Sequence, residues 1–194
     1  MDILEGKYAW MVKIGEKGQF VIPKEAREVF GFQPGEEIIV PTPGFGLYET
    51  IATISGARTV PLDVTETGFQ ITKEALEAAI TPRTKAIIIN SPNNPSGVVY
   101  TEETLKAVRR IITDKIIDYC HTIYLISDEP YRELTYGVEA PWIPSLYQDT
   151  IVCYSYSKSL SLPGERIGYV YVPRNATQSK ILYAAIAGAA RACG

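Results

Sequence analysis

The sequence is poor in the residue types and patterns that mark disulfide, metal or membrane proteins. Its 194 residues include one histidine and three cysteines, and the cysteines lie far apart at Cys120, Cys153 and Cys193. This spacing forms neither a disulfide framework nor a zinc site, so we expect no metal and a reducing, cytoplasmic environment. No apolar run approaches the roughly 20 residues that span a bilayer. The acidic start, Met1–Glu5, lacks the basic region of a signal peptide.

The charge balance is also unremarkable. The formal net charge is −3, with 21% charged and 46% hydrophobic residues. Composition therefore gives no sign of a nucleic-acid or membrane partner, although it supplies enough apolar material for a hydrophobic core.

Two zones differ in composition. Residues 1–37 are polar, rich in lysine and punctuated by glycine, whereas residues 38–194 alternate β-branched runs with helical patterns. We predict a small β-hairpin and helix segment at 1–37 and a larger α/β domain at 38–194. In that domain we expect strands near 38–40, 60–64, 86–90, 123–127, 150–155 and 167–172, and helices near 46–56, 73–80, 101–119 and 176–192.

This alternation of strands and helices favours a mostly parallel sheet with helices on both faces. Ligands of such sheets bind beyond the carboxyl ends of the strands. Polar residues follow three predicted strands, at Asn90, at Asp128 and at Ser155–Lys158. The topology therefore predicts one polar site at this edge of the sheet.

The motifs at these strand ends resemble the active-site set of class I/II aminotransferases, which belong to fold-type I. They are Ser155-Tyr156-Ser157-Lys158-Ser159 with Arg166 eight residues later, Asp128-Glu129-Pro130-Tyr131, and Asn93-Asn94-Pro95-Ser96-Gly97. Each motif alone has an ordinary alternative, such as a solvated loop residue or a turn former. Their order and spacing favour the functional interpretation over about residues 34–194.

The resemblance implies pyridoxal 5'-phosphate as cofactor. It implies that Lys158 forms the Schiff base and that Asp128 partners the pyridine nitrogen, so that the ring can act as an electron sink. Tyr131 and Asn94 would hydrogen-bond the ring oxygen.

The other expected cofactor contacts are with the phosphate and the ring face. The resemblance gives Arg166 and Ser155 to the phosphate, since a guanidinium suits bidentate phosphate binding. It stacks Phe45 on the ring, although an aromatic residue after Pro-Gly can also simply pack.

The implied reaction is amino-group transfer between an amino acid and a 2-oxo acid, in a homodimer. The family's glycine-rich phosphate loop and its C-terminal small domain have no counterpart in the sequence. We therefore expect a truncated protein that is weakly active or inactive.

The N-terminal zone resembles a different family. Val12–Glu36 has the order of an AbrB-type swapped-hairpin DNA-binding domain, with a Lys-Gly turn, an Ile-Pro strand end and a closing Pro-Gly-Glu. The resemblance implies a dimer that presents basic side chains to DNA, with these candidates: Lys13, Lys17, Lys24 and Arg27. An ordinary solvated face is the alternative, because glutamates are interspersed.

Two functional hypotheses besides the aminotransferase therefore stay open. One is a DNA-binding transcriptional regulator or antitoxin-like dimer. The other is a fusion or truncated reading frame in which neither half completes its fold.

Overall fold

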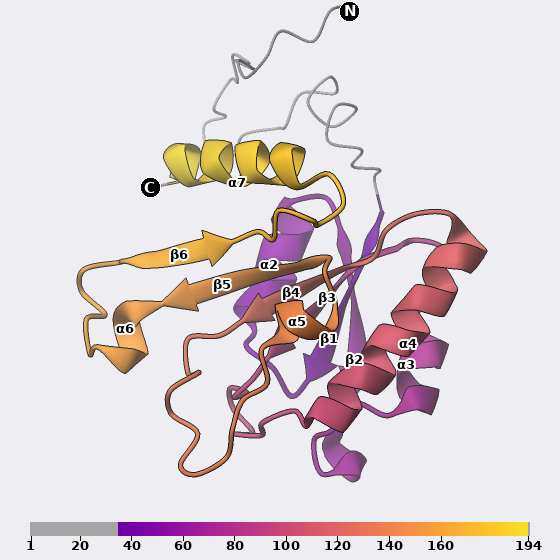
Figure 1. Cartoon of the computed structure of the whole chain (residues 1–194), viewed down its shortest axis with the longest axis horizontal. Helices are drawn as coiled ribbons and strands as arrows, with labels where there is room; N and C mark the ends of the chain where they lie inside the picture. The colour runs from indigo at the N-terminus through magenta and orange to yellow at the C-terminus, as the bar shows by residue number, and fades with distance from the viewer. Residues whose placement is uncertain (1–34, 194) are drawn as a thin grey trace, which may run out of the picture. The chain divides into compact units, whose positions relative to one another are not determined.

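The computed structural model describes residues 35–193 (Figure 1). Residues 35–179 form one compact unit, and helix α7 (Ser179–Cys193) belongs to a second unit and is considered by itself. The predicted boundary between residues 37 and 38 falls inside the first strand. The AbrB-like segment lies outside the described residues, and with it the candidates Lys13, Lys17, Lys24 and Arg27.

The unit is built on a six-stranded sheet with the order β2-β1-β3-β4-β5-β6. All neighbouring strands are parallel except β5 and β6, which are antiparallel. The sheet confirms the predicted α/β class, and each strand lies close to its predicted range. The strands are β1 (Glu37–Thr42), β2 (Arg58–Asp63), β3 (Thr84–Asn90), β4 (Tyr124–Asp128), β5 (Thr150–Ser155) and β6 (Gly168–Tyr171).

Local sequence explains where the two central helices begin. The Thr72 hydroxyl accepts a hydrogen bond from the Ala75 amide at the start of α3 (Lys73–Ala79). The Thr101 hydroxyl does the same for Thr104 at the start of α4 (Glu102–Tyr119). Such caps satisfy amide groups that have no partner within the helix.

Four further short elements complete the unit. These elements are α2 (Leu47–Ile54), the 3₁₀ turn η1 (Thr65–Thr67), α5 (Ile143–Leu146) and α6 (Tyr156–Ser159). Of the four, only α2 was predicted as a helix, over residues 46–56.

The main hydrophobic core lies between one face of the sheet and helices α3, α4 and α5, and α3 and α4 run side by side there (Figure 1). Leu76, Leu105 and Ile112 of the helices pack on strand residues such as Ile87 and Leu125. Because side chains alternate along a strand, Asp128 of β4 points to the opposite face from Leu125. Helix α2 lies on that opposite face, since its Tyr48 contacts Asp128.

The two edge strands differ in character. Pro61 lies in β2, and β2 is an edge strand, as the proline predicts. At the other edge all four residues of β6 are exposed. Gly168 is required at the start of β6, because a Cβ there would lie 2.2 Å from the Tyr154 carbonyl oxygen.

Candidate functional site

Three strand ends converge at one edge of the sheet. The register pairs Asn90 of β3 with Asp128 of β4, and Asp128 with Cys153 of β5. Ser155 ends β5, and Lys158 follows within α6. The polar residues that were predicted to meet at strand ends therefore lie on adjacent strands.

Asn90 links two of these strand ends. Its side-chain amide donates to the Asp128 carbonyl at 2.9 Å, and its side-chain oxygen accepts from the Asn94 amide at 2.7 Å. The residue is buried, so both bonds are shielded from water. Asn90 thereby fixes the Asn94 turn against the end of β4. The sequence placed Asn90 at a strand end but gave it no such role.

Asp128 is held by a side chain that the sequence motifs did not identify. The Tyr48 hydroxyl on α2 donates to the Asp128 carboxylate at 2.5 Å. Burial raises the pKa of Asp128 above its ordinary value, and the Tyr48 hydrogen bond opposes part of that rise. The pKa of Tyr48 is also raised, first by burial and then by the neighbouring Asp128 charge. No motif in the sequence points to Tyr48, which lies 80 residues from Asp128.

Two neighbours extend this region of the site. The rings of Phe45 and Tyr48 meet edge to face, with centroids 5.7 Å apart. Cys153 lies beside Asp128, and burial together with the carboxylates of Asp128 and Glu129 raises its pKa to about 11. At neutral pH Cys153 is therefore a neutral thiol in the floor of the site.

Lys158 lies near Tyr131. The Lys158 Nζ atom is 5.7 Å from the centroid of the Tyr131 ring, a cation–π distance. Ser155 caps α6, since its hydroxyl accepts from the Ser157 amide at 3.2 Å and donates to the Ser157 hydroxyl at 2.8 Å. The cap sets the direction in which Lys158 leaves the strand end.

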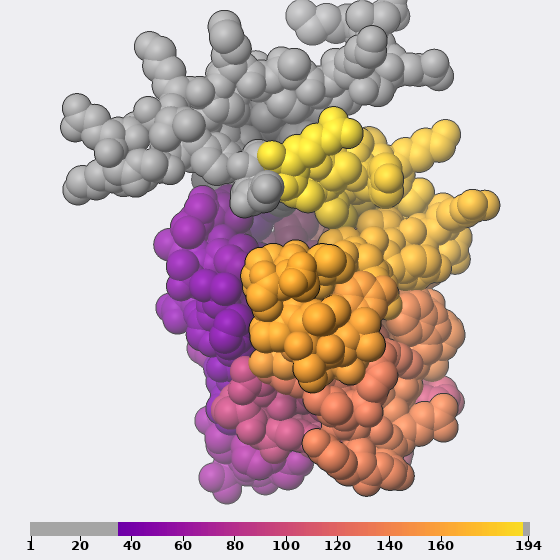
Figure 2. Space-filling model, turned by 90° about the vertical axis from the view of Figure 1, so that its left-hand side faces the viewer, coloured from indigo at the N-terminus to yellow at the C-terminus, as the bar shows by residue number. Residues whose placement is uncertain are grey.

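Arg166 and Phe45 are more peripheral than the resemblance implies. Arg166 has a left-handed backbone, with φ of 52°, and its guanidinium donates to the Pro163 carbonyl at 2.9 Å. Residues 161–171 are exposed, and Figure 2 shows the orange segment around α6 on the molecular surface. Phe45 is 44% exposed.

A hollow of about 380 Å³ adjoins the site. Asn94 and Tyr131 both line it, and the other lining residues are uncharged. They come from the turn that contains Asn94 and from the segment after Tyr131: Pro92, Asn93, Pro95, Gly97, Val99, Leu134, Thr135 and Tyr136. The two groups with predicted roles at the ring oxygen therefore border one cavity.

The described residues hold no group of three or more His, Cys, Asp or Glu side chains that could bind a metal ion. Among the helices of residues 35–193, none is both long and apolar enough to cross a membrane.

Comparison with known proteins gives a consistent result. Residues 24–192 match the family model for aminotransferase class I and II. The chain is 38% identical to a probable N-acetyl-LL-diaminopimelate aminotransferase from Bacillus subtilis, over 73% of this chain and 35% of that protein. It is 41% identical to an aspartate aminotransferase from Geobacillus stearothermophilus, over 73% of this chain and 36% of that protein.

Solved structures agree with these matches. An aminotransferase from Eubacterium rectale superposes with a TM-score of 0.80 and 47% identity, covering 84% of this chain and 41% of that one. The Thermus thermophilus aspartate aminotransferase with maleate gives a TM-score of 0.68 and 34% identity, covering 79% of this chain and 38% of that one. The chain thus spans little more than a third of the length of the curated relatives that it matches.

Proposed function

The chain belongs to the class I and II aminotransferases, and from that premise we propose that it binds pyridoxal phosphate through Lys158. Pyridoxal phosphate is the cofactor of this family. The observation that carries the proposal is the convergence of Asp128, Tyr131 and Lys158 beyond neighbouring strand ends, with the lysine amine next to the tyrosine ring.

The donor set fits this cofactor. Bound pyridoxal phosphate supplies an electron sink through its protonated ring. Asp128 would face the pyridine nitrogen, and a cation there would favour the ionised carboxylate that burial alone disfavours. Tyr131 and Asn94 would donate to the ring oxygen, and both border the same hollow.

Lys158 has two roles in the proposal. Its amine would hold the cofactor through the aldehyde, and it would also take and return the proton at the substrate Cα.

The substrates proposed are an amino acid and a 2-oxo acid, and the assembly proposed is a homodimer. We expect weak turnover by a single, unassembled chain, because its Lys158 and residues 161–171 are exposed to solvent. Exclusion of water normally strengthens the electrostatic interactions on which such a reaction depends. Cofactor binding and turnover are therefore tested separately.

The test of cofactor binding is reduction with borohydride in the presence of pyridoxal phosphate, followed by peptide mapping. We expect one dominant label, on Lys158, and its loss in Lys158→Arg. Lys73→Arg, which alters an exposed lysine of α3, is the matched control and should label as the wild type does. Equal labelling of several surface lysines would contradict the proposal.

The second candidate function is DNA binding, and it is motivated by the AbrB-like pattern of Val12–Glu36. Binding through lysine and arginine should weaken steeply with salt, because phosphate contacts release counterions. We expect Lys17→Ala to reduce duplex binding if this function exists. Duplex binding that is absent at low salt, or unchanged in Lys17→Ala, would refute it.

A further inference from the structure

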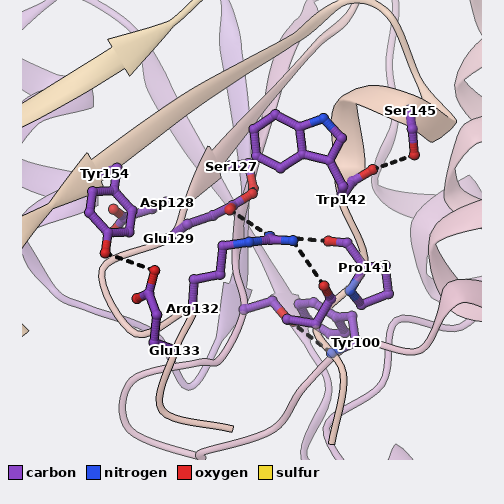
Figure 3. A network of polar contacts seen from close by, with 12 residues as sticks. Tyr100, Ser127, Asp128, Glu129, Arg132, Glu133, Pro141, Trp142, Ser145 and Tyr154 are labelled. Carbon is purple, nitrogen blue, oxygen red and sulfur yellow. Dashed lines mark hydrogen bonds and ion pairs between the residues drawn. The ribbon is translucent and has the colours of Figure 1, made fainter. Parts of the chain in front are cut away.

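A partly buried ion pair joins Glu129, the residue after Asp128, to Arg132 (Figure 3). Asp128 points toward Tyr48, whereas its neighbours Ser127 and Glu129 point to the other face of the same strand end. The Ser127 hydroxyl donates to Glu129 Oε1 at 2.7 Å, and Arg132 Nη1 donates to Glu129 Oε2 at 2.7 Å. Both carboxylate oxygens of Glu129 are therefore occupied.

Because the Glu129 carboxylate is buried, the loss of its partner Arg132 would be costly. Glu129 is 1% exposed and Ser127 is fully buried. An ionised carboxylate at such a depth is costly unless it is paired and hydrogen-bonded. The Arg132 guanidinium is therefore held in one orientation by Glu129.

From that orientation the guanidinium closes a loop. Arg132 Nη2 donates to the Ala140 carbonyl at 3.0 Å, and Nη1 donates to the Pro141 carbonyl at 3.3 Å. The guanidinium carbon also lies 5.1 Å from the centroid of the Trp142 ring. Residues 133–139 consequently form a loop whose two ends are held together by the Arg132 guanidinium. Leu134, Thr135 and Tyr136, which line the hollow beside Asn94, lie within this loop.

A second contact joins the loop to the helix that carries Lys158. The Tyr154 hydroxyl donates to Glu133 Oε1 at 2.9 Å (Figure 3). The same Tyr154 hydroxyl oxygen lies 2.7 Å from the Ser159 hydroxyl oxygen. Ser159 adjoins Lys158 and Glu133 adjoins Arg132. The segment that carries Tyr131 is thus tied both to the core behind the sheet and to α6.

We propose that Arg132 is a positioning residue that holds Tyr131 against Lys158 by fixing both ends of the 133–139 loop. This inference rests on the proposed function, because the position of Tyr131 matters only if Tyr131 donates to the bound cofactor. Arg132 itself touches neither Lys158 nor Asn94 through any hydrogen bond in the described residues.

The test measures the concentration of pyridoxal phosphate that gives half-maximal borohydride labelling of Lys158. We expect Arg132→Met to raise this concentration about tenfold, which corresponds to about 1.4 kcal/mol. Arg132→Lys should recover part of the loss, since a lysine can pair with Glu129 but cannot also bridge two carbonyl groups. Arg109→Met, at an exposed arginine of α4, is the matched control and should change nothing.

A double-mutant cycle separates positioning from general stability. If Arg132 acts through Tyr131, Arg132→Met in a Tyr131→Phe background should change half-maximal labelling by less than about twofold. Chymotrypsin cleavage after Leu134 or Tyr136 should also become faster in Arg132→Met, because the loop loses its closure. A tenfold effect that persists in the Tyr131→Phe background would overturn the inference.

One variant guards against misfolding, since Arg132→Met leaves a buried carboxylate unpaired. Glu129→Gln with Arg132→Met removes both charges together, which is far less costly than removing one. If this folded variant labels Lys158 at wild-type concentrations, Arg132 has no positioning role. If the wild type itself does not label Lys158, the proposed function fails and not this step alone.

Discussion

The Tyr48–Asp128 hydrogen bond leads to the sharpest test of the site. Tyr48→Phe removes one hydroxyl and leaves the ring that packs against Phe45. Asp128 then loses a donor while its carboxylate stays buried. Because that hydrogen bond favours the ionised form, the pKa of Asp128, already raised by burial, should rise further in the variant.

The sign of the pH dependence follows from linkage. In the wild type the native state holds its Asp128 proton to a higher pH than the unfolded chain does. Asp128 therefore lowers stability as the pH rises from its ordinary pKa through its folded pKa. A hydrogen bond to a charged group contributes about 1.5–3 kcal/mol, against about 0.5–1.5 kcal/mol for a neutral one. Tyr48→Phe should cost the larger amount at pH 8 and the smaller amount near pH 4.

Urea unfolding of wild type and variant from pH 4 to 8 measures this difference. Tyr147→Phe is the matched control, because the buried Tyr147 hydroxyl donates to the neutral Ile123 carbonyl at 2.6 Å. Its cost should be independent of pH over this range. A Tyr48→Phe cost that is the same at pH 4 and pH 8 would refute the assignment of a charged partner to Tyr48.

Two further predictions concern the sheet. The Glu37 carboxylate is buried beside Arg58; burial alone would raise its pKa, but hydrogen bonds, one of them from Arg58, lower it overall. Arg58→Ala should cost about 1–2 kcal/mol at pH 7, less than for a fully buried pair because the Arg58 side chain is 65% exposed. The loss should shrink only as the pH falls below the ordinary pKa of Glu37, so a cost that is the same at pH 7 and pH 3 in urea titrations would contradict it. Gly168→Ala should cost at least about 2 kcal/mol in thermal unfolding, because its Cβ would collide with the Tyr154 carbonyl. Gly46→Ala, whose Cβ meets no described atom within 4 Å, should stay within about 0.5 kcal/mol, and equal losses for the two glycine variants would count against the steric argument.

The sequence predicted the fold well because its signals are local. The run from Ala86 to Ile89 reads as a strand covered on both sides, and the structure buries all four residues. Thr72 and Thr101 mark helix starts that the structure confirms with hydrogen bonds. The short helices α5 and α6 were not predicted, since four residues contain too little periodicity to detect.

The support of the site could not be predicted, because it depends on contacts between segments far apart in the chain. Tyr48 reaches Asp128 across 80 residues, and no motif links a helix residue of the opposite face to a particular strand end. Arg132 is close to Tyr131 in sequence, but its role depends on Glu129 pointing away from the site while Asp128 points into it. That alternation follows from the pleat of β4, so the two adjacent carboxylates meet different partners on opposite faces of the sheet. Asp128 points to the face of Tyr48, where the proposal places the cofactor, whereas both carboxylate oxygens of Glu129 bind Ser127 and Arg132 on the other face.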